Sequence, residues 1–190
     1  MNAALRAKAM LLDPWAEWTK IEQESGDAAY LLSRFVAILA LVPAVFGFIG
    51  ACLIGVVVPG VGVVRASLFD GIFGAAFGYA MTCATVLVLG LLINALAPLF
   101  GGRRDFDSAL KLAVYSYTPV WLAGIFLLLP GLRFLGLTAF YAAYVLWTGL
   151  PQLTKSPEQN SPTYAAVIVV AACALIAVAA AAQRALCGAI

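Results

Sequence analysis

The stretch FVAILALVPAVFGFIGACLIGVVVPGVGVV, residues 35–64, contains no Asp, Glu, Lys or Arg. Four further charge-free stretches follow it, at residues 71–102, 112–132, 134–154 and 159–183. A helix needs about 20 apolar residues to cross about 30 Å of hydrocarbon, so each stretch is long enough to span a bilayer. Because the backbone in lipid must satisfy its own hydrogen bonds, the pattern predicts an all-α membrane protein with five transmembrane helices.

The composition supports the same class. Of the 190 residues, 64% are hydrophobic and 11% are charged, whereas soluble domains carry about 25% charged residues. The mean hydropathy is +1.02, which argues against a soluble helical bundle. The sequence has no histidine, the commonest metal ligand and general base, and its four cysteines form no C-x-x-C pair. We therefore predict no metal site and no cofactor.

Proline and glycine residues separate the apolar runs. Pro59-Gly60, Pro98, Pro130-Gly131 and Pro151 interrupt helices, because proline lacks the amide hydrogen and glycine favours turns. The predicted spans cover about residues 35–57, 72–97, 112–130, 134–152 and 164–183. They form a membrane domain over residues 34–190, preceded by a cytoplasmic N-terminal segment over residues 1–33.

Lysine and arginine residues set the predicted orientation. Eight lie in the N-terminal segment and in the loops after the second and fourth spans, and three lie on the other side. Because cytoplasmic loops carry the excess of Lys and Arg, we expect the N-terminus in the cytoplasm and the C-terminus outside. The eight are Arg6, Lys8, Lys20, Arg34, Arg103, Arg104, Lys111 and Lys155, and the three are Arg65, Arg133 and Arg184.

A short amphipathic helix is predicted before the first span. Asp13-Pro14 is typical of a helix start, with an N-cap followed by proline at the first helical position. Trp15, Trp18 and Ile21 then recur at a spacing of three and share one face. Two interpretations remain open for this face: it lies on the inner membrane surface, where Trp is favoured, or it packs on the cytoplasmic end of the bundle.

Polar residues near the cytoplasmic ends of the spans are the candidate site. One interpretation is an interfacial belt of aromatic side chains with polar helix caps. The other is a cytoplasm-facing polar pocket, in which Pro119 leaves a carbonyl group near Tyr115 without its usual partner. The candidate pocket residues are Asn94, Tyr115, Ser116, Tyr117, Pro119 and Gln152.

Two further groups concern packing and lipid contact. Gly71, Gly74 and Gly78 give the second span a small face, for packing within the chain or for a dimer contact. The loop at residues 101–105 is polar, and Asp105 or Asp107 can cap the helix that follows it. The basic residues in and after this loop are candidates for contact with anionic lipid headgroups. They are Arg103, Arg104 and Lys111.

No catalytic constellation is found in the sequence. It contains no Ser/His or Cys/His pair, no H-E-x-x-H, no G-x-S-x-G and no P-loop. No charged residue lies deep within a predicted span, so the usual marker of an ion path is missing. We therefore expect a protein that is not an enzyme.

Four segments of the sequence are distinctive: LLDPWAEW (residues 11–18), APLFGG (97–102), ALKLAVYSYTPVW (109–121) and YVLWTGLP (144–151). They resemble the bacterial type of the Yip-domain (Ypt/Rab-interacting) family of integral membrane proteins. The resemblance implies five spans, a cytosolic N-terminus and an external C-terminus. Eukaryotic members act in membrane trafficking, bind prenylated GTPases and associate with one another. This chain has a shorter cytosolic segment and lacks the family's aspartate-leucine-tyrosine-glycine-proline motif, which argues against GTPase binding.

The leading functional hypothesis is a non-enzymatic inner membrane protein that organises the membrane or recruits a partner at its cytoplasmic face. The alternative is a transporter or channel for small solutes or lipids that uses the polar pocket. The candidate partners are the lipid bilayer, a second copy of the chain or another membrane protein, and a cytoplasmic protein. Nucleic acid is not a candidate partner.

Overall fold

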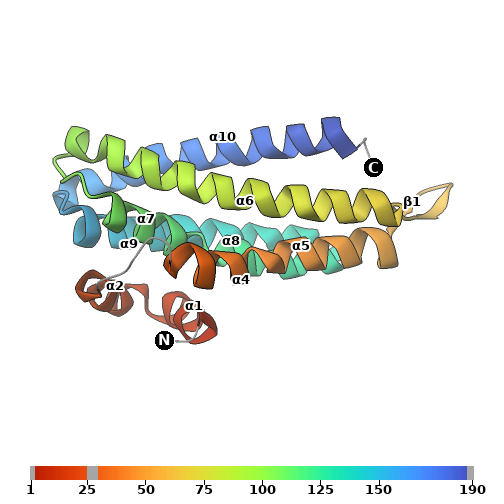
Figure 1. The fold of residues 1–190 in the computed structure, drawn as a ribbon, viewed down its shortest axis with the longest axis horizontal. Helices are drawn as coiled ribbons and strands as arrows, with labels where there is room; N and C mark the ends of the chain where they lie inside the picture. The colour runs from red at the N-terminus through yellow and green to blue at the C-terminus, as the bar shows by residue number, and fades with distance from the viewer. Residues whose placement is uncertain (1–2, 25–29, 188–190) are drawn as a thin grey trace.

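The computed structural model describes residues 3–24 and 30–187, which form an elongated helical bundle (Figure 1). Residues 25–29 of the predicted cytoplasmic segment lie outside the described residues. Within the described part, four helices are long and apolar enough to cross a membrane. They are Leu31–Ile54, Leu68–Phe100, Phe106–Leu128 and Glu158–Ala185. They match the first, second, third and fifth predicted spans.

The first membrane helix mixes α and π turns and leads into a short hairpin. Its parts are η1 (Leu31–Val36), α4 (Ala37–Leu39), α5 (Leu41–Phe48) and η2 (Ile49–Ile54). Gly55 then takes a φ of 81°, which a glycine adopts without strain, and the helix ends. Strands β1 (Val56–Val58) and β2 (Gly62–Val64) pair antiparallel around Pro59-Gly60. This hairpin is a small exception to the predicted all-α fold.

The second membrane helix is α6 (Leu68–Leu96), which Ser67 caps by accepting the amide of Asp70. The α-helix ends where Pro98 was expected to stop it. One more turn, η3 (Ala97–Phe100), carries the chain through the proline to Gly101, whose φ is 77°.

The third membrane helix is divided by Pro119. It consists of α7 (Phe106–Ser116), α8 (Thr118–Ala123) and η4 (Gly124–Leu128). Asp105 caps α7 by accepting the amide of Asp107 at 3.2 Å, which confirms the predicted cap. The interruption at Tyr117 lies where proline removes the next helical hydrogen bond.

The fourth predicted span, residues 134–152, is not among the four long apolar helices. The chain there forms an unusually long 3-10 helix, η5 (Pro130–Phe140), followed by α9 (Tyr141–Thr154). After η6 (Glu158–Asn160), α10 (Ser161–Cys187) completes the bundle beside α6. The predicted count of five spans is therefore supported for four of them by helix length and composition.

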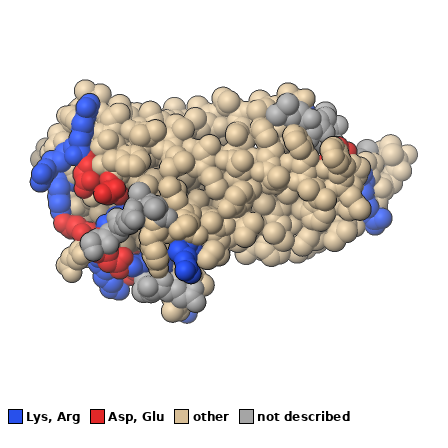
Figure 2. All heavy atoms as spheres, viewed as in Figure 1, with Lys and Arg blue, Asp and Glu red and all other residues tan. Residues whose placement is uncertain are grey.

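Helices α1 (Ala3–Leu12) and α2 (Pro14–Gln23) lie against one end of the bundle, and the β-hairpin lies at the other (Figure 1). We call the first the polar end, formed by α2 and the loops at residues 101–105 and 155–160, and the second the hairpin end. Charged atoms gather at these ends, and the surface between them in the view of Figure 2 is almost free of charge.

Contacts between distant segments build the polar end. Lys155 pairs with Glu22 of α2, and the amide of Arg103 donates to the carbonyl oxygen of Thr154 at 2.8 Å. These contacts join α2 and the two loops that were predicted to share one side of the membrane.

Candidate functional site

Trp18 docks α2 onto α9. Its side chain is fully buried, and its Nε1 donates to the carbonyl oxygen of Val145 at 3.1 Å and to Oγ1 of Thr148 at 3.2 Å. Gly149 makes room for the indole, because a Cβ at this position would lie 2.5 Å from Cε2 of Trp18. The buried ring, the two hydrogen bonds of the indole and the space left at Gly149, which we call the glycine seat, together fix α2 on the bundle.

This docking decides between the two interpretations of the N-terminal amphipathic face. Trp18 and Ile21 are fully buried in protein, so they do not lie on the membrane surface; the face packs on the end of the bundle. Trp15 differs, since 53% of it is exposed. The predicted start of this helix is confirmed: Oδ1 of Asp13 accepts the amide of Ala16 at 3.1 Å, and Pro14 takes the first position.

The exposed apolar face belongs to α1 instead. Leu5 and Leu12 are both exposed, and a spacing of seven places them on one side of the helix. The Tyr141 hydroxyl donates to the carbonyl oxygen of Leu11 at 3.2 Å, at the start of α9. Since the 14 residues of α9 rise about 21 Å, this contact places the C-terminal end of α1 well away from the loop that follows α9.

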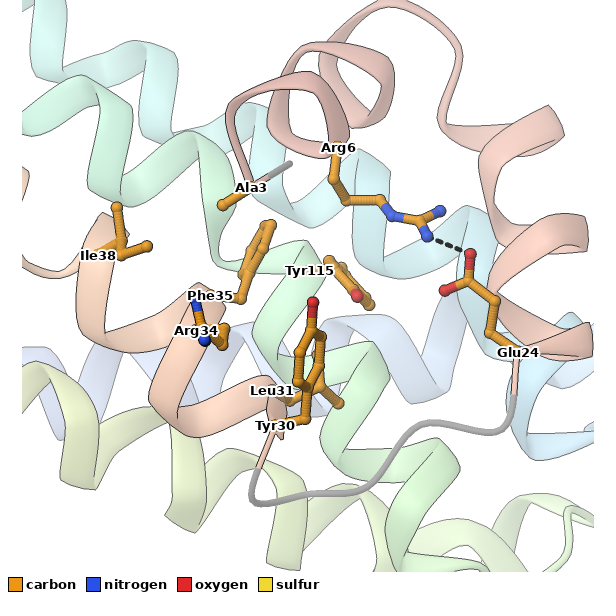
Figure 3. A pocket seen from close by; sticks show the side chains of 9 residues that line it. All are labelled: Ala3, Arg6, Glu24, Tyr30, Leu31, Arg34, Phe35, Ile38 and Tyr115. Carbon is orange, nitrogen blue, oxygen red and sulfur yellow. Dashed lines mark hydrogen bonds and ion pairs between the residues drawn. The ribbon is translucent and has the colours of Figure 1, made fainter. Parts of the chain in front are cut away.

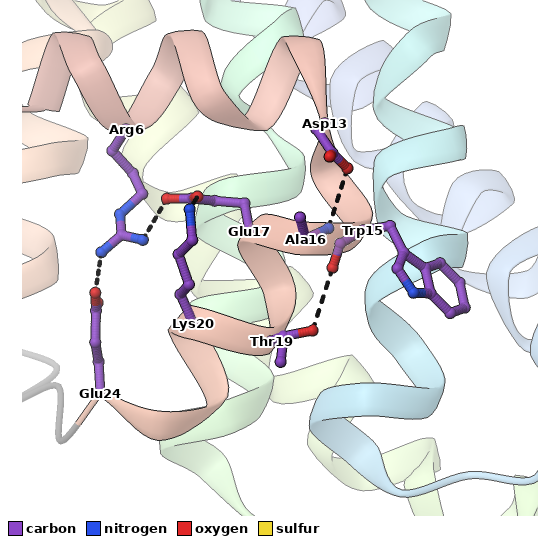
Figure 4. Close-up of polar contacts among 8 residues, drawn as sticks. All are labelled: Arg6, Asp13, Trp15, Ala16, Glu17, Thr19, Lys20 and Glu24. Atoms are coloured by element: carbon purple, nitrogen blue, oxygen red, sulfur yellow. Dashed lines mark hydrogen bonds and ion pairs between the residues drawn. The ribbon is translucent and has the colours of Figure 1, made fainter.

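A buried ion-pair network joins α1 to α2 (Figure 4). Nη1 of Arg6 lies 2.5 Å from Oε1 of Glu17, and both side chains are almost completely buried. Arg6 also pairs with Glu24, and Lys20 lies 3.0 Å from the second oxygen of Glu17. Burial opposes the charge of Arg6, but its hydrogen bond with Glu24 and the nearby carboxylates leave its pKa raised. Arg6 therefore stays protonated at any physiological pH.

The basic residues expected at lipid headgroups have different surroundings. Lys111 is buried, and its Nζ donates to the carbonyl oxygen of Glu24, so it holds α7 to the N-terminal segment rather than facing lipid. The expectation for Lys111 is therefore wrong, because a contact distant in sequence covers it. Arg103 and Arg104 are exposed at the polar end, where headgroup contact stays a prediction.

The candidate polar residues do not converge on one pocket. Gln152 belongs to the α2 docking contact, since its Oε1 accepts a hydrogen bond from Oγ1 of Thr19 at 3.2 Å. Ser116 and Tyr117 are buried at the break between α7 and α8. The side-chain oxygens of Asn94 and Ser116 are buried and form no hydrogen bond within the described structure.

Helix pairing explains why these residues lie apart. Gly90 of α6 lies against Leu110 of α7, and Nε1 of Trp121 donates to Oγ1 of Thr82 at 3.1 Å. The two helices therefore run antiparallel, so Asn94 lies nearer the polar end than Leu110, whereas Tyr117 lies farther from it. The sequence placed all of them near one membrane face but could not show these different depths.

Two cavities border the candidate residues. The first, of about 350 Å³, includes Tyr115, and the second, of about 600 Å³, includes Pro119 in a largely apolar lining. The lining of the first is shown in Figure 3: Ala3, Arg6, Glu24, Tyr30, Leu31, Arg34, Phe35, Ile38 and Tyr115. The sequence analysis did not identify Arg6 and Arg34 as cavity residues. The available signals were a cation, Arg6, within the largely apolar run AALRAKAMLL and a second cation, Arg34, directly before the first predicted span.

The glycines of α6 pack within the chain. A Cβ at Gly71 would lie 2.0 Å from Sγ of Cys52, so only glycine fits against the first membrane helix there. The carbonyl oxygen of Gly74 accepts a hydrogen bond from Nε2 of Gln183 of α10 at 3.2 Å. Gly78 lies beside the same Gln183 side chain. These contacts agree with packing inside one chain.

Comparison with known proteins places this arrangement in a family. The sequence model described as the Yip1 domain matches residues 8–181. The chain belongs to the Yip1 domain family. This confirms the resemblance seen in the sequence, and the Yip1 domain here runs from α1 into α10, so the docked α2 and its seat on α9 are inside it.

Two curated relatives match most of the chain. The chain is 25% identical to Inner membrane protein YohC of Escherichia coli strain K12 over 155 residues, which cover 80% of each protein. The protein of the same name from Escherichia coli O6:H1 matches with the same identity and coverage. No solved structure matches the chain. The protein is thus a Yip1-family membrane protein.

Proposed function

We propose that this Yip1-domain protein is a non-enzymatic protein of the bacterial inner membrane that recruits a partner protein at its cytoplasmic face. The observation that carries the proposal is the docking of α2 by Trp18 onto α9. It presents a fixed, polar surface at one end of an otherwise apolar bundle. Thr19, Lys20 and Gln23 are exposed on α2, with Thr19 at the edge of the contact with Gln152 of α9. A preorganised surface of this kind lowers the entropic cost of binding.

The proposed arrangement in the membrane has five crossings, with the polar end in the cytoplasm and the C-terminus outside. The excess of Lys and Arg at the polar end supports this orientation. Segment Pro130–Thr154 supports the fifth crossing. At about 2.0 Å per residue for η5 and about 1.5 Å for α9, it extends about 43 Å, more than the hydrocarbon thickness. The name of the E. coli relatives supports the inner membrane.

Cysteine labelling tests the orientation. In a variant without native cysteines, Val61→Cys at the hairpin tip should react with a membrane-impermeant maleimide in cells whose outer membrane is permeabilised. Thr19→Cys on α2 should react only after the inner membrane is also opened. Labelling of Thr19→Cys before that step would place the polar end outside and would overturn the cytoplasmic assignment.

Site-specific crosslinking tests recruitment. A photoreactive residue at Thr19 should give a discrete protein adduct in native membranes, whereas one at the exposed Val170 of α10 should not. The adduct at Thr19 should disappear when Trp18→Ala releases α2. The adduct should persist in Trp147→Ala. This variant removes a tryptophan that is 45% exposed on α9, the helix to which α2 docks.

The outcomes separate recruitment from membrane organisation. Adducts with lipid alone at Thr19 would favour a role in organising the membrane and would contradict recruitment. Equal protein adducts in Trp18→Ala and Trp147→Ala would show that docked α2 is not the recruiting surface. We do not propose transport, because Asn94, Tyr117 and Gln152 lie in separate places.

A further inference from the structure

A cavity of about 350 Å³ lies between α1, the start of the first membrane helix and α7 (Figure 3). Ala3 and Arg6 come from α1, and Tyr115 comes from α7. The wall along the first membrane helix extends from Tyr30 to Ile38, about two helical turns. The cavity therefore begins among charged groups at the polar end and continues along a membrane-spanning helix.

Charge around the polar part of the cavity is positive. Among the described residues, Arg6 and Lys20 pair with the carboxylates of Glu17 and Glu24, and Lys111 donates to the main-chain carbonyl oxygen of Glu24. Arg34 adds a fourth cation, so the group carries two more cations than carboxylates. Arg34 is exposed and forms no ion pair with any residue that the structure describes. Its guanidinium is free to take an anion with two parallel hydrogen bonds, the geometry that suits phosphate.

The remaining wall is apolar. Leu31, Phe35 and Ile38 lie at spacings of four and three, so they form one stripe on the first membrane helix. Ile38 is 52% exposed on the surface of that helix, which is long and apolar enough to cross a membrane. A small soluble anion would leave this stripe without a partner. A molecule with an anionic head and an apolar tail covers both walls.

We propose that this cavity binds the headgroup of an anionic glycerophospholipid from the leaflet next to the polar end. The phosphate lies at Arg34, the Tyr30 hydroxyl donates to it, and an acyl chain follows Phe35 and Ile38 into the bilayer. Basic pockets between membrane helices are suited to such headgroups. The site is separate from the proposed recruiting surface, because Thr19, Lys20 and Gln23 do not line the cavity. Figure 4 shows Arg6 and Thr19 on different sides of α2.

Native mass spectrometry of the delipidated full-length protein in detergent tests the site. Titration with phosphatidylglycerol should give one tightly bound lipid per chain, and phosphatidylcholine should bind more weakly. Arg34→Gln should weaken phosphatidylglycerol binding about tenfold, the effect of losing a charge-assisted contact. Lys8→Gln, which removes an exposed cation of α1 that does not line the cavity, should leave binding unchanged.

A second variant keeps the proposal testable if Arg34→Gln fails to fold. Ile38→Trp places a bulky ring across the apolar wall and should reduce lipid binding while Arg34 is intact. Equal loss in Arg34→Gln and Lys8→Gln, or no loss in either, would overturn the proposal. So would equal binding of phosphatidylcholine, or displacement of the lipid by millimolar inorganic phosphate, which would identify a free-phosphate site.

Discussion

The polar end and the hairpin end of the bundle are built by different means. At the polar end, Trp18, Arg6 and Glu17 are buried and bonded to partners on other helices. At the hairpin end, Val61 is 74% exposed, and Leu68 and Phe69 at the start of α6 are exposed as well. One end thus relies on specific polar contacts, whereas the other presents apolar side chains outward.

The membrane helices show the same contrast. In the most apolar 18 residues of Phe106–Leu128, 67% are buried inside the protein, against 11% in those of Glu158–Ala185. Lipid tails are as apolar as leucine, so burial in a membrane gives little direction to helix packing. Hydrogen bonds and glycine contacts must supply specificity, and they concentrate where the N-terminal helices dock. Substitutions at the two ends should therefore differ in effect.

Replacing Trp18 should have the largest effect. Trp18→Ala removes a fully buried ring and two indole hydrogen bonds, which should cost about 3 to 5 kcal/mol and release α2 from α9. Limited proteolysis should then cut α1–α2 much faster, and the unfolding temperature in detergent should fall. Trp147→Ala, at a half-exposed position, serves as the control and should change neither measurement appreciably.

Breaking the buried ion pair should rank second. Glu17→Ala leaves the buried Arg6 with one ion-pair partner among the described residues, Glu24, which should cost about 3 kcal/mol of docking free energy. Chemical denaturation followed by Trp fluorescence measures this. The control is Glu22→Ala, on the same helix as Glu17. It removes only an exposed ion pair with Lys155, which follows α9, and should cost about 0.2 to 1 kcal/mol. Similar losses of docking free energy in Glu17→Ala and Glu22→Ala would mean that the buried Arg6–Glu17 pair stabilises the polar end no more than an exposed ion pair does.

Filling the glycine seat should have a moderate effect. A Cβ at Gly149 would lie 2.5 Å from the Trp18 ring and 2.6 Å from Leu112, so Gly149→Ala should destabilise docking by about 1 to 3 kcal/mol. The proteolysis assay used for Trp18 measures it. Gly136→Ala is the matched control, because nothing lies within 4 Å of a Cβ there. A harmless Gly149→Ala would show that the indole does not occupy this seat.

Changing the hairpin tip should have the smallest effect. Val61→Ser alters an exposed side chain and should shift stability by less than about 0.5 kcal/mol. The unfolding midpoint in detergent measures this shift. A loss comparable to that of Glu17→Ala would contradict the view that the hairpin end tolerates change.

Much of the fold could be predicted from local sequence signals. The charge-free stretches predicted the membrane helices, Asp13-Pro14 predicted the start of α2, and Asp105 was one of two residues predicted to cap α7. Each signal acts within a few residues, so one sequence is enough to detect it. The β-hairpin and the long 3-10 helix η5 were not predicted, since apolar residues fit helix, strand and 3-10 turns alike.

The candidate site could be predicted only in part, because it depends on contacts between distant residues. A spacing of three placed Trp18 and Ile21 on one face but could not show that α9 covers that face. Lys111 was predicted to contact lipid headgroups, but in the folded protein its Nζ donates to the carbonyl oxygen of Glu24, 87 residues away in the sequence. Arg6 and Glu17 meet across the turn between two helices, where no periodic pattern links them.

The most direct test of the account uses the native contact between α2 and the loop after α9. A zero-length carbodiimide reagent, applied to the full-length protein in membranes, should join Glu22 to Lys155, because these side chains form an ion pair when α2 is docked. Peptide mass spectrometry should find this link in the unaltered protein and in Trp147→Ala, and should lose it in Trp18→Ala. No Glu22–Lys155 link in the unaltered protein, or an equal yield in Trp18→Ala, would contradict docking of α2 through Trp18.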